Sequence, residues 1–171
     1  MKHLNPLFIC KKVNEIAGKL ASWFNILLVA LVGVDVVFRY IFNATSIWVM
    51  ELEWHFFSLI FLFGGGYAFQ KNQHVRVDVF YDKFSEKQKA EINFWGGILF
   101  LIPWTLFLMY TSFNYAKISF LISESSPDPG GLPARYLIKY AIFFGFLLLF
   151  LEAIISVVEN GILLFQKEFK K

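Results

Sequence analysis

LASWFNILLVALVGVDVVFRYIF, residues 20–42, contains only two charged residues, Asp35 and Arg39. A helix of about 20 residues crosses the roughly 30 Å hydrocarbon core of a bilayer, so this stretch is long enough to span a membrane. The whole chain is 57% hydrophobic and 17% charged, whereas soluble domains average about 45–50% and about 25%. A small soluble domain cannot hide such an excess in its core. The sequence therefore predicts a membrane protein.

Three further stretches have the length and the apolar composition of a span. The expected spans are residues 20–42, 47–69, 92–122 and 136–165. The last two would be about 46 Å long as helices, so we expect them to tilt or to project from the bilayer. Pro103 lacks a backbone donor and is expected to kink the third. The first is too long for a signal peptide and is kept as a span. The predicted fold is all-α, a single domain over residues 1–171 with four long, tilted transmembrane helices.

The distribution of basic residues predicts how these spans are oriented. Twelve lysines and arginines lie in the two tails and in the polar segment between spans two and three, and four lie on the other side. Loops rich in lysine and arginine remain in the cytoplasm. Both termini are therefore expected to be cytoplasmic, with the protein in the bacterial inner membrane.

The polar segment KNQHVRVDVFYDKFSEKQKAEINFW, residues 71–95, has an ambiguous first half. Val75, Val77 and Val79 alternate as in a strand, but Val77 also begins a helical stripe with Phe80, Tyr81 and Phe84. A lone strand would leave unpaired backbone groups near lipid. We therefore favour a short amphipathic helix in the membrane plane at about 76–84, with a solvated loop as the alternative. Ser85 and Gln88 predict a capping box that starts the third span's helix.

Charged residues inside spans are functional candidates because their burial in a membrane is costly. They gather in the outer halves of the first two spans: Asp35, Arg39, Glu51, Glu53 and His55. The short turn at residues 43–46 brings Arg39 to nearly the depth of Glu51. One interpretation is a static network of Asp35, Arg39 and Glu51 that locks the hairpin. The other is a proton relay or a cation site built from Glu51 or Glu53 with His55. Glu152 is a further lone acid, expected near the cytoplasmic end of the fourth span, where it could pair with a lysine or contact a partner.

Two glycine-containing segments complete the candidates. Gly64 and Ala68 have the small-xxx-small spacing that allows close helix approach, although a flexible helix end is the alternative. The outer loop ESSPDPGGLPARY, residues 124–136, combines prolines that restrict the backbone with glycines that permit positive φ. Such a rigid loop suits either a docking surface or a simple tight connection. Its candidate residues are Pro127, Asp128, Pro129, Gly130, Gly131 and Arg135.

Several classes of function lack their residues in this chain. It has no nucleotide-binding loop, no recognisable nucleophile–base pair and one cysteine, Cys10, so no cysteine-based metal cluster is expected. His55 is the one histidine within a span, which disfavours a dihaem anchor. Four spans without a polar stripe along their length make a poor channel. The residues alone indicate a non-enzymatic subunit of a larger membrane complex.

Three segments carry a resemblance to a known family. They are WVMELEW at residues 48–54, GGGYAFQKNQHVRVDVFYDKFS at residues 64–85 and SPDPGGLPARYLIK at residues 126–139. With four spans and both ends inside, the chain resembles, over nearly its whole length, the small membrane subunit of tripartite ATP-independent periplasmic (TRAP) transporters. The resemblance marks His74, Arg76, Asp78 and Tyr81 as a cytoplasmic interfacial motif.

The resemblance implies partners rather than a catalytic site. A large multi-span subunit, in a one-to-one heterodimer with this chain, would hold the substrate and sodium sites and move as an elevator. This chain would enlarge the immobile frame, contact lipid and help dock a periplasmic binding protein. It would need no cofactor or metal of its own and no nucleic acid. The expected substrates are organic acids: C4-dicarboxylates, other carboxylates, sialic acid or sulfonates. The alternatives are a membrane anchor of a redox enzyme and a small self-assembling exporter.

Overall fold

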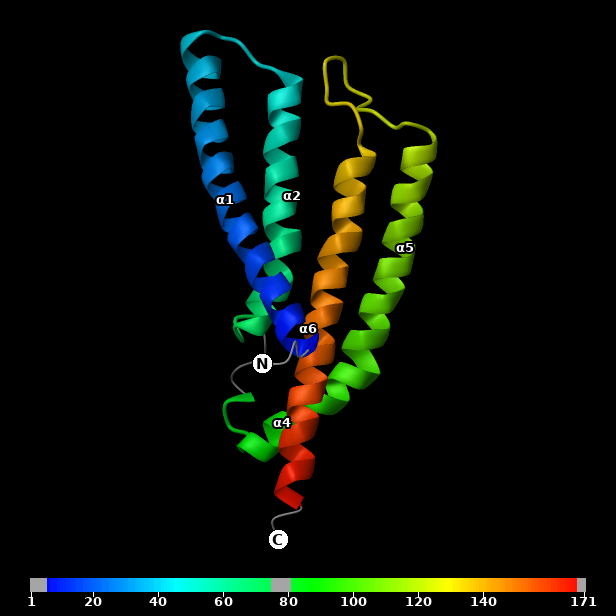
Figure 1. Ribbon diagram of the computed structural model, residues 1–171. Helices are drawn as coiled ribbons and strands as arrows, with labels where there is room; N and C mark the ends of the chain where they lie inside the picture. Colours follow the sequence, from blue (N-terminus) through cyan, green and yellow to red (C-terminus); the bar gives the residue numbers. More distant parts are fainter. Residues whose placement is uncertain (1–5, 75–80, 169–171) are drawn as a thin grey trace.

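The computed structural model describes residues 6–74 and 81–168, with side chains up to residue 165. Its elements, labelled as in Figure 1, are α1 (Pro6–Ile41), α2 (Ile47–Gln70), α4 (Glu86–Gly96), the π-helical turn η1 (Gly97–Leu101), α5 (Ile102–Leu121) and α6 (Tyr136–Glu168). Within these residues no strand occurs, and four helices are long and apolar enough to cross a membrane, α4 through α5 counting as one. The predicted all-α membrane fold is confirmed. Most of the expected in-plane helix, at about 76–84, lies outside the described residues and stays a prediction.

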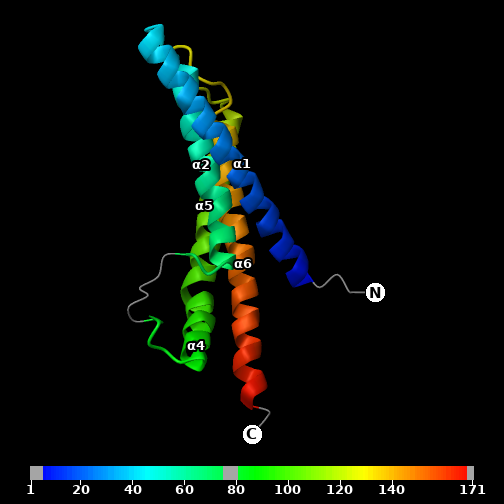
Figure 2. The same ribbon diagram turned by 90° about the vertical axis from the view of Figure 1, so that its left-hand side faces the viewer.

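The helices lie in a row rather than in a closed bundle. α1 packs on α2, α2 on α6 and α6 on α5, and α1 also touches α6. Figure 1 shows this order from one edge to the other, and in the perpendicular view of Figure 2 α2, α5 and α6 overlap while α1 crosses them obliquely. We call the end with residues 42–46 and 122–135 the loop end, and the end with residues 6 and 168 the terminal end.

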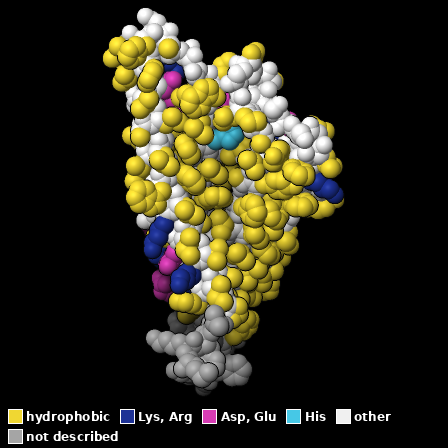
Figure 3. Space-filling view, turned by 45° about the horizontal axis from the view of Figure 1, so that its top comes forward, with side chains coloured by type: hydrophobic (Ala, Val, Ile, Leu, Met, Phe, Trp, Pro, Cys, Tyr) yellow, Lys and Arg dark blue, Asp and Glu magenta, His cyan; other side chains and the backbone are white. Residues whose placement is uncertain are grey.

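Small residues form the contacts between these helices. The buried apolar residues are mostly alanines, such as Ala116 and Ala153 at 0% exposed. A Cβ on Gly18 would lie 2.4 Å from the Tyr67 ring, and one on Gly145 would lie 2.9 Å from the Leu62 Cβ. Small residues let helix backbones approach closely where lipid is the solvent. Large apolar side chains point outward instead, and Figure 3 shows hydrophobic side chains covering most of one face.

The first helix begins well before the expected span, at Pro6 rather than near residue 20. Proline is tolerated in the first turn of a helix, because its missing N–H needs no partner there. The extension packs against its neighbours along one helical face, where the buried residues recur: Asn14, Ala17, Gly18 and Ala21. Tertiary contacts along that face carry the helix beyond the apolar stretch that hydropathy detects.

The third helix starts where the sequence predicts and is irregular before Pro103. Ser85 caps α4 through the predicted capping box: Gln88 N–H donates to the Ser85 hydroxyl, and the Ser85 N–H donates to the Gln88 side chain. Further along, Ile102 N–H donates to the Gly97 carbonyl, the wider bond of a π-helical turn. This turn stands directly before Pro103, which the sequence marked as the irregular point.

Replacing Ser85 with alanine is expected to fray the start of α4. The change removes the acceptor of the Gln88 N–H, and the loss of such a cap costs about 1 kcal/mol. Faster hydrogen exchange at the amides of residues 86–90, compared with Ser85→Asp, which keeps an acceptor, would show the effect. Equal exchange in the two variants would contradict the capping role.

Candidate functional site

The best-organised polar site lies at the loop end, around the carboxylate of Glu51. Glu51 stands near the start of α2 and is only 4% exposed. Its Oε1 accepts hydrogen bonds from the Ser126 hydroxyl at 2.5 Å and from Arg135 at 3.3 Å. Its Oε2 accepts the Leu132 backbone N–H at 2.5 Å. One side chain of α2 therefore fastens the α5–α6 loop, 75 or more residues away, at three points.

The loop is shaped to present those donors. Ser126 N–H donates to the Leu132 carbonyl at 3.0 Å, and Gly131 N–H donates to the Asp128 carbonyl at 3.0 Å. Of the two glycines expected to permit positive φ, Gly130 adopts it, at +81°. Gly131 is needed for a different reason, because a Cβ there would lie 2.4 Å from the Ser126 hydroxyl and 2.9 Å from the Glu51 carboxylate. The carboxylate can approach the loop only because residue 131 has no side chain.

Arg135 connects the loop to the aromatic surface of α2. Its guanidinium lies 5.8 Å from the Trp54 ring centre, a cation–π contact, in addition to its ion pair with Glu51. Its Nε is buried and has no hydrogen-bond partner among the described residues. The His55 Nδ1 lies 2.5 Å from the Glu51 backbone carbonyl, so the ring meets the backbone rather than the carboxylate. Arg135 thus belongs to a loop-to-helix clamp.

A second ion pair fastens the two ends of the same loop. Lys139 of α6 donates to the Glu124 carboxylate at 2.5 Å and lies over the Tyr115 ring at 4.1 Å. The hydrogen bond from Lys139 is the main cause that holds the pKa of Glu124 below its ordinary value of 4.5. The Arg135 N–H also donates to the Glu124 carbonyl at 2.8 Å. The loop is therefore closed at its base as well as clamped at its centre.

This ion pair predicts a loss of stability in acid. The pKa of Glu124 is lowered by folding, so its carboxylate stabilises the folded state above the ordinary value of 4.5, and this contribution disappears as the pH falls through the lower pKa of the folded state. We expect the thermal midpoint of the wild type to fall more steeply than that of Glu124→Gln in that acidic range. Unfolding curves at a series of pH values would measure it, and parallel pH profiles would contradict it.

The predicted outer cluster does not form one network. Arg39 pairs with Asp35 on the same helix, at 2.5 Å and with i, i+4 spacing. Among the described residues no ion pair or hydrogen bond joins Arg39 to Glu51, so the static network of Asp35, Arg39 and Glu51, one of the two interpretations of this cluster, was wrong. Glu51 bonds with the loop instead, because it lies on the face of α2 that is turned toward α6. Glu53 Oε1 is buried without a hydrogen-bond partner. No group of three or more histidine, cysteine or acidic residues suited to a metal occurs in the described chain.

The predicted interfacial motif is described only in part. His74 lies next to Phe69, with ring centres 5.8 Å apart. The Tyr81 hydroxyl accepts a hydrogen bond from Asn93 of α4 at 2.9 Å. Arg76 and Asp78 lie outside the described residues, so their role stays a prediction.

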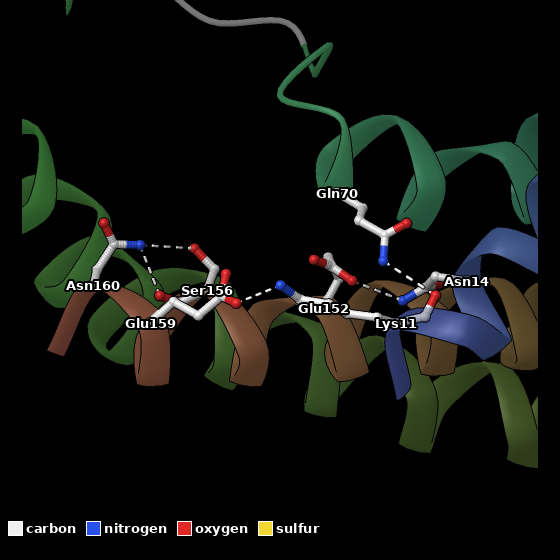
Figure 4. A network of polar contacts seen from close by, with 7 residues as sticks. All are labelled: Lys11, Asn14, Gln70, Glu152, Ser156, Glu159 and Asn160. Carbon is white, nitrogen blue, oxygen red and sulfur yellow. Dashed lines mark hydrogen bonds and ion pairs between the residues drawn. The ribbon is translucent and has the colours of Figure 1, made fainter. Parts of the chain in front are cut away.

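Sequence reasoning missed a polar centre at the terminal end, drawn in Figure 4. Asn14 of α1 is 0% exposed and donates to the Glu152 carboxylate at 3.0 Å and to the Leu148 carbonyl at 3.3 Å. The Gln70 amide donates to the Lys11 carbonyl at 3.1 Å, and Lys11 pairs with Glu159. The signal that could have found Asn14 is its position on one helical face with Ala17, Gly18 and Ala21. These contacts hold α1, α2 and α6 together.

The geometry first defines a class of protein: a multi-pass α-helical membrane protein. Polar contacts fasten its row of helices at both ends, and its described residues include no recognisable set of catalytic groups. The family follows from comparison. Residues 28–160 match the family described as tripartite ATP-independent periplasmic transporters, DctQ component. The chain belongs to this family and is a small subunit of a TRAP transporter. Members work with a large DctM subunit and a periplasmic binding protein. A comparison with curated proteins finds no match to this chain.

Proposed function

We propose that this chain is the scaffold subunit of a sodium-coupled TRAP transporter for organic acids, and that its loop end helps to dock the periplasmic binding protein. The main observation behind this proposal is the Glu51 clamp, the three hydrogen bonds that hold the 124–135 loop against α2. A docking surface binds at lower entropic cost when it is already ordered. Substrate and sodium sites are assigned to the large subunit, and this chain acts without a cofactor of its own.

The scaffold role is supported by the row of helices. A single row buries few large side chains and leaves apolar surface exposed, for example at Phe57, 64% exposed, and Phe61, 74% exposed. A large partner needs such a surface, and lipid covers the remainder. The polar clamps keep the row rigid, as a frame beside a moving domain requires.

The orientation is supported by charge. The terminal end carries the basic tails and the basic α2–α4 connection, so the positive-inside rule places it in the cytoplasm of a bacterial inner membrane. The loop end then faces the periplasm, where the binding protein is. The Lys139–Glu124 pair and the Arg135–Trp54 contact lie where the bilayer interface is expected.

Co-purification tests the subunit assignment. The tagged chain, extracted from its native membrane in mild detergent, should retain a large multi-span protein in a one-to-one ratio. Recovery of a dehydrogenase with a haem spectrum, or of this chain as a homo-oligomer alone, would overturn the assignment. Uptake of radiolabelled dicarboxylate, sialic acid and sulfonate by proteoliposomes, with and without a sodium gradient, then tests the substrate class and the coupling ion.

A further inference from the structure

A polar cavity of about 420 Å³ lies at the terminal end, among the last turn of α2, the residues before α4, α4 itself and α6. Ten of its twelve lining residues are polar, charged or tyrosine. They are Gln70, Asn72, Tyr81, Asp82, Glu86, Lys89, Asn93, Glu152, Ser156 and Asn160. In a chain whose surface is largely apolar, a hollow of this composition needs an explanation. Glu152 and Gln70 also belong to the polar centre that joins α1, α2 and α6, but neither that centre nor the loop clamp accounts for the hollow itself.

The cavity carries an excess of negative charge. Three of its lining residues are acids and one is a lysine. Lys89 is already paired with Glu86 at 3.3 Å. Asp82 and Glu152 have no ion pair within 4 Å among the described residues. Lys11 lies near Glu152, but it is paired with Glu159, so acids still outnumber bases around the cavity. The cavity therefore favours a cationic occupant.

Glu152 is the deepest of these acids, at 5% exposed in the middle of an apolar helix. Its Oε2 accepts one hydrogen bond from the neutral amide of Asn14. Figure 4 shows its second oxygen turned away from Asn14, on the side of Ser156. Nearby Lys11 is engaged with Glu159. Gln70 contributes a buried Oε1 that has no hydrogen-bond partner. The Gln70 Oε1 and the Glu152 oxygen turned away from Asn14 are both acceptors, so each can take a hydrogen bond from a donor.

The lining distinguishes among cationic occupants. A bare metal ion is disfavoured, since no metal-binding group of histidine, cysteine and acidic residues occurs in the described chain, and the volume far exceeds one ion. A phospholipid is disfavoured because only Phe69 and Ala90 of the lining are apolar, so the cavity offers too little apolar surface for acyl chains to pack against. A long side chain that ends in an ammonium or guanidinium group fits the volume, the charge and the acceptors.

We propose that this cavity receives a lysine or arginine side chain of the large subunit. The inference rests on the proposed function, because it requires that partner and the cytoplasmic position of the terminal end. Cytoplasmic loops of membrane proteins are rich in lysine and arginine, so the partner presents basic side chains at this level. A buried acid that meets such a side chain fixes the register of two membrane subunits where apolar surfaces alone do not.

The first test removes the charge and keeps the shape. In the complex purified through the tagged chain, Glu152→Gln should retain about tenfold less large subunit than the wild type after washing, as the loss of a charge-assisted contact implies. The isolated Glu152→Gln chain should unfold at the wild-type temperature, because glutamine still accepts from Asn14. The matched control is Glu91→Gln, which changes a half-exposed acid of α4 outside the cavity, paired with Lys87; this variant should retain the partner fully.

The second test identifies the occupant. A photoreactive p-benzoylphenylalanine at Ser156, which lines the cavity, should cross-link in the complex to a peptide of the large subunit that contains lysine or arginine. Adducts found only on this chain or on lipid would overturn the inference, and so would full retention by Glu152→Gln. If the wild type retains no large subunit, the proposed function fails together with the inference. If it does and Glu152→Gln does as well, only the inference fails.

Discussion

Replacing Glu51 with alanine is expected to release the 124–135 loop from α2. The change removes the acceptor of the Ser126 hydroxyl and of the Leu132 N–H, and it leaves the half-buried Arg135 without its carboxylate. Leaving a buried polar group without a hydrogen-bond partner costs free energy, and leaving a buried charged group without one costs more. The Leu132 amide should exchange at least about tenfold faster, since a charge-assisted hydrogen bond accounts for that factor or more. Hydrogen exchange with mass spectrometry of the loop peptides measures this directly.

The same helix offers a matched control. Glu53→Ala removes an equal charge two residues away, but Glu53 makes no hydrogen bond or ion pair to the loop in the described chain. It should leave exchange at Leu132 unchanged. If Glu51→Ala also leaves it unchanged, the clamp does not order the loop. Binding-protein-dependent uptake by the two variants then tests whether the ordered loop serves docking.

Replacing Gly66 with valine is expected to be the most disruptive single change at the terminal end. A Cβ at this position would lie 2.5 Å from the Asn14 Oδ1 and 3.1 Å from the Leu148 backbone. Asn14 cannot move aside, because it is fully buried and holds both Glu152 and Leu148. Overpacking of this kind costs roughly 1–3 kcal/mol. The thermal midpoint of the purified chain should therefore fall by roughly 2–12 °C, measured by tryptophan fluorescence.

The neighbouring glycines provide the comparison. Gly64 and Gly65 have no atom within 4 Å of a Cβ built on them, so valine fits at either position. Gly64→Val and Gly65→Val should unfold close to the wild-type temperature. A similar loss in all three variants would mean that helix propensity, rather than the junction of α1, α2 and α6, is the cause. If Gly66→Val is harmless, the close approach at Asn14 does not matter for stability.

Local patterns were enough to predict much of the architecture. The lengths of the apolar stretches predicted four long helices, and the Ser85 and Gln88 spacing predicted the cap that starts α4. These features depend on residues close together in the chain, so they can be read without knowing which helices meet. Glu51, Gly131 and Arg135 were also recognised as candidates, each for a local reason.

The tertiary structure alone decided how those candidates combine. The turn at residues 43–46 places Arg39 and Glu51 at similar depths in the membrane, which suggested that they would pair. In the structure Glu51 faces α6 and pairs with Arg135, 84 residues further along. Asn14 and Ser126 were not singled out as partners at all. In helices that are apolar on nearly every side, hydropathy specifies the length of each span but not its rotation about its axis. Which acid meets which base depends on that rotation, and it is set by the close contacts of small residues between helices that are distant in the sequence.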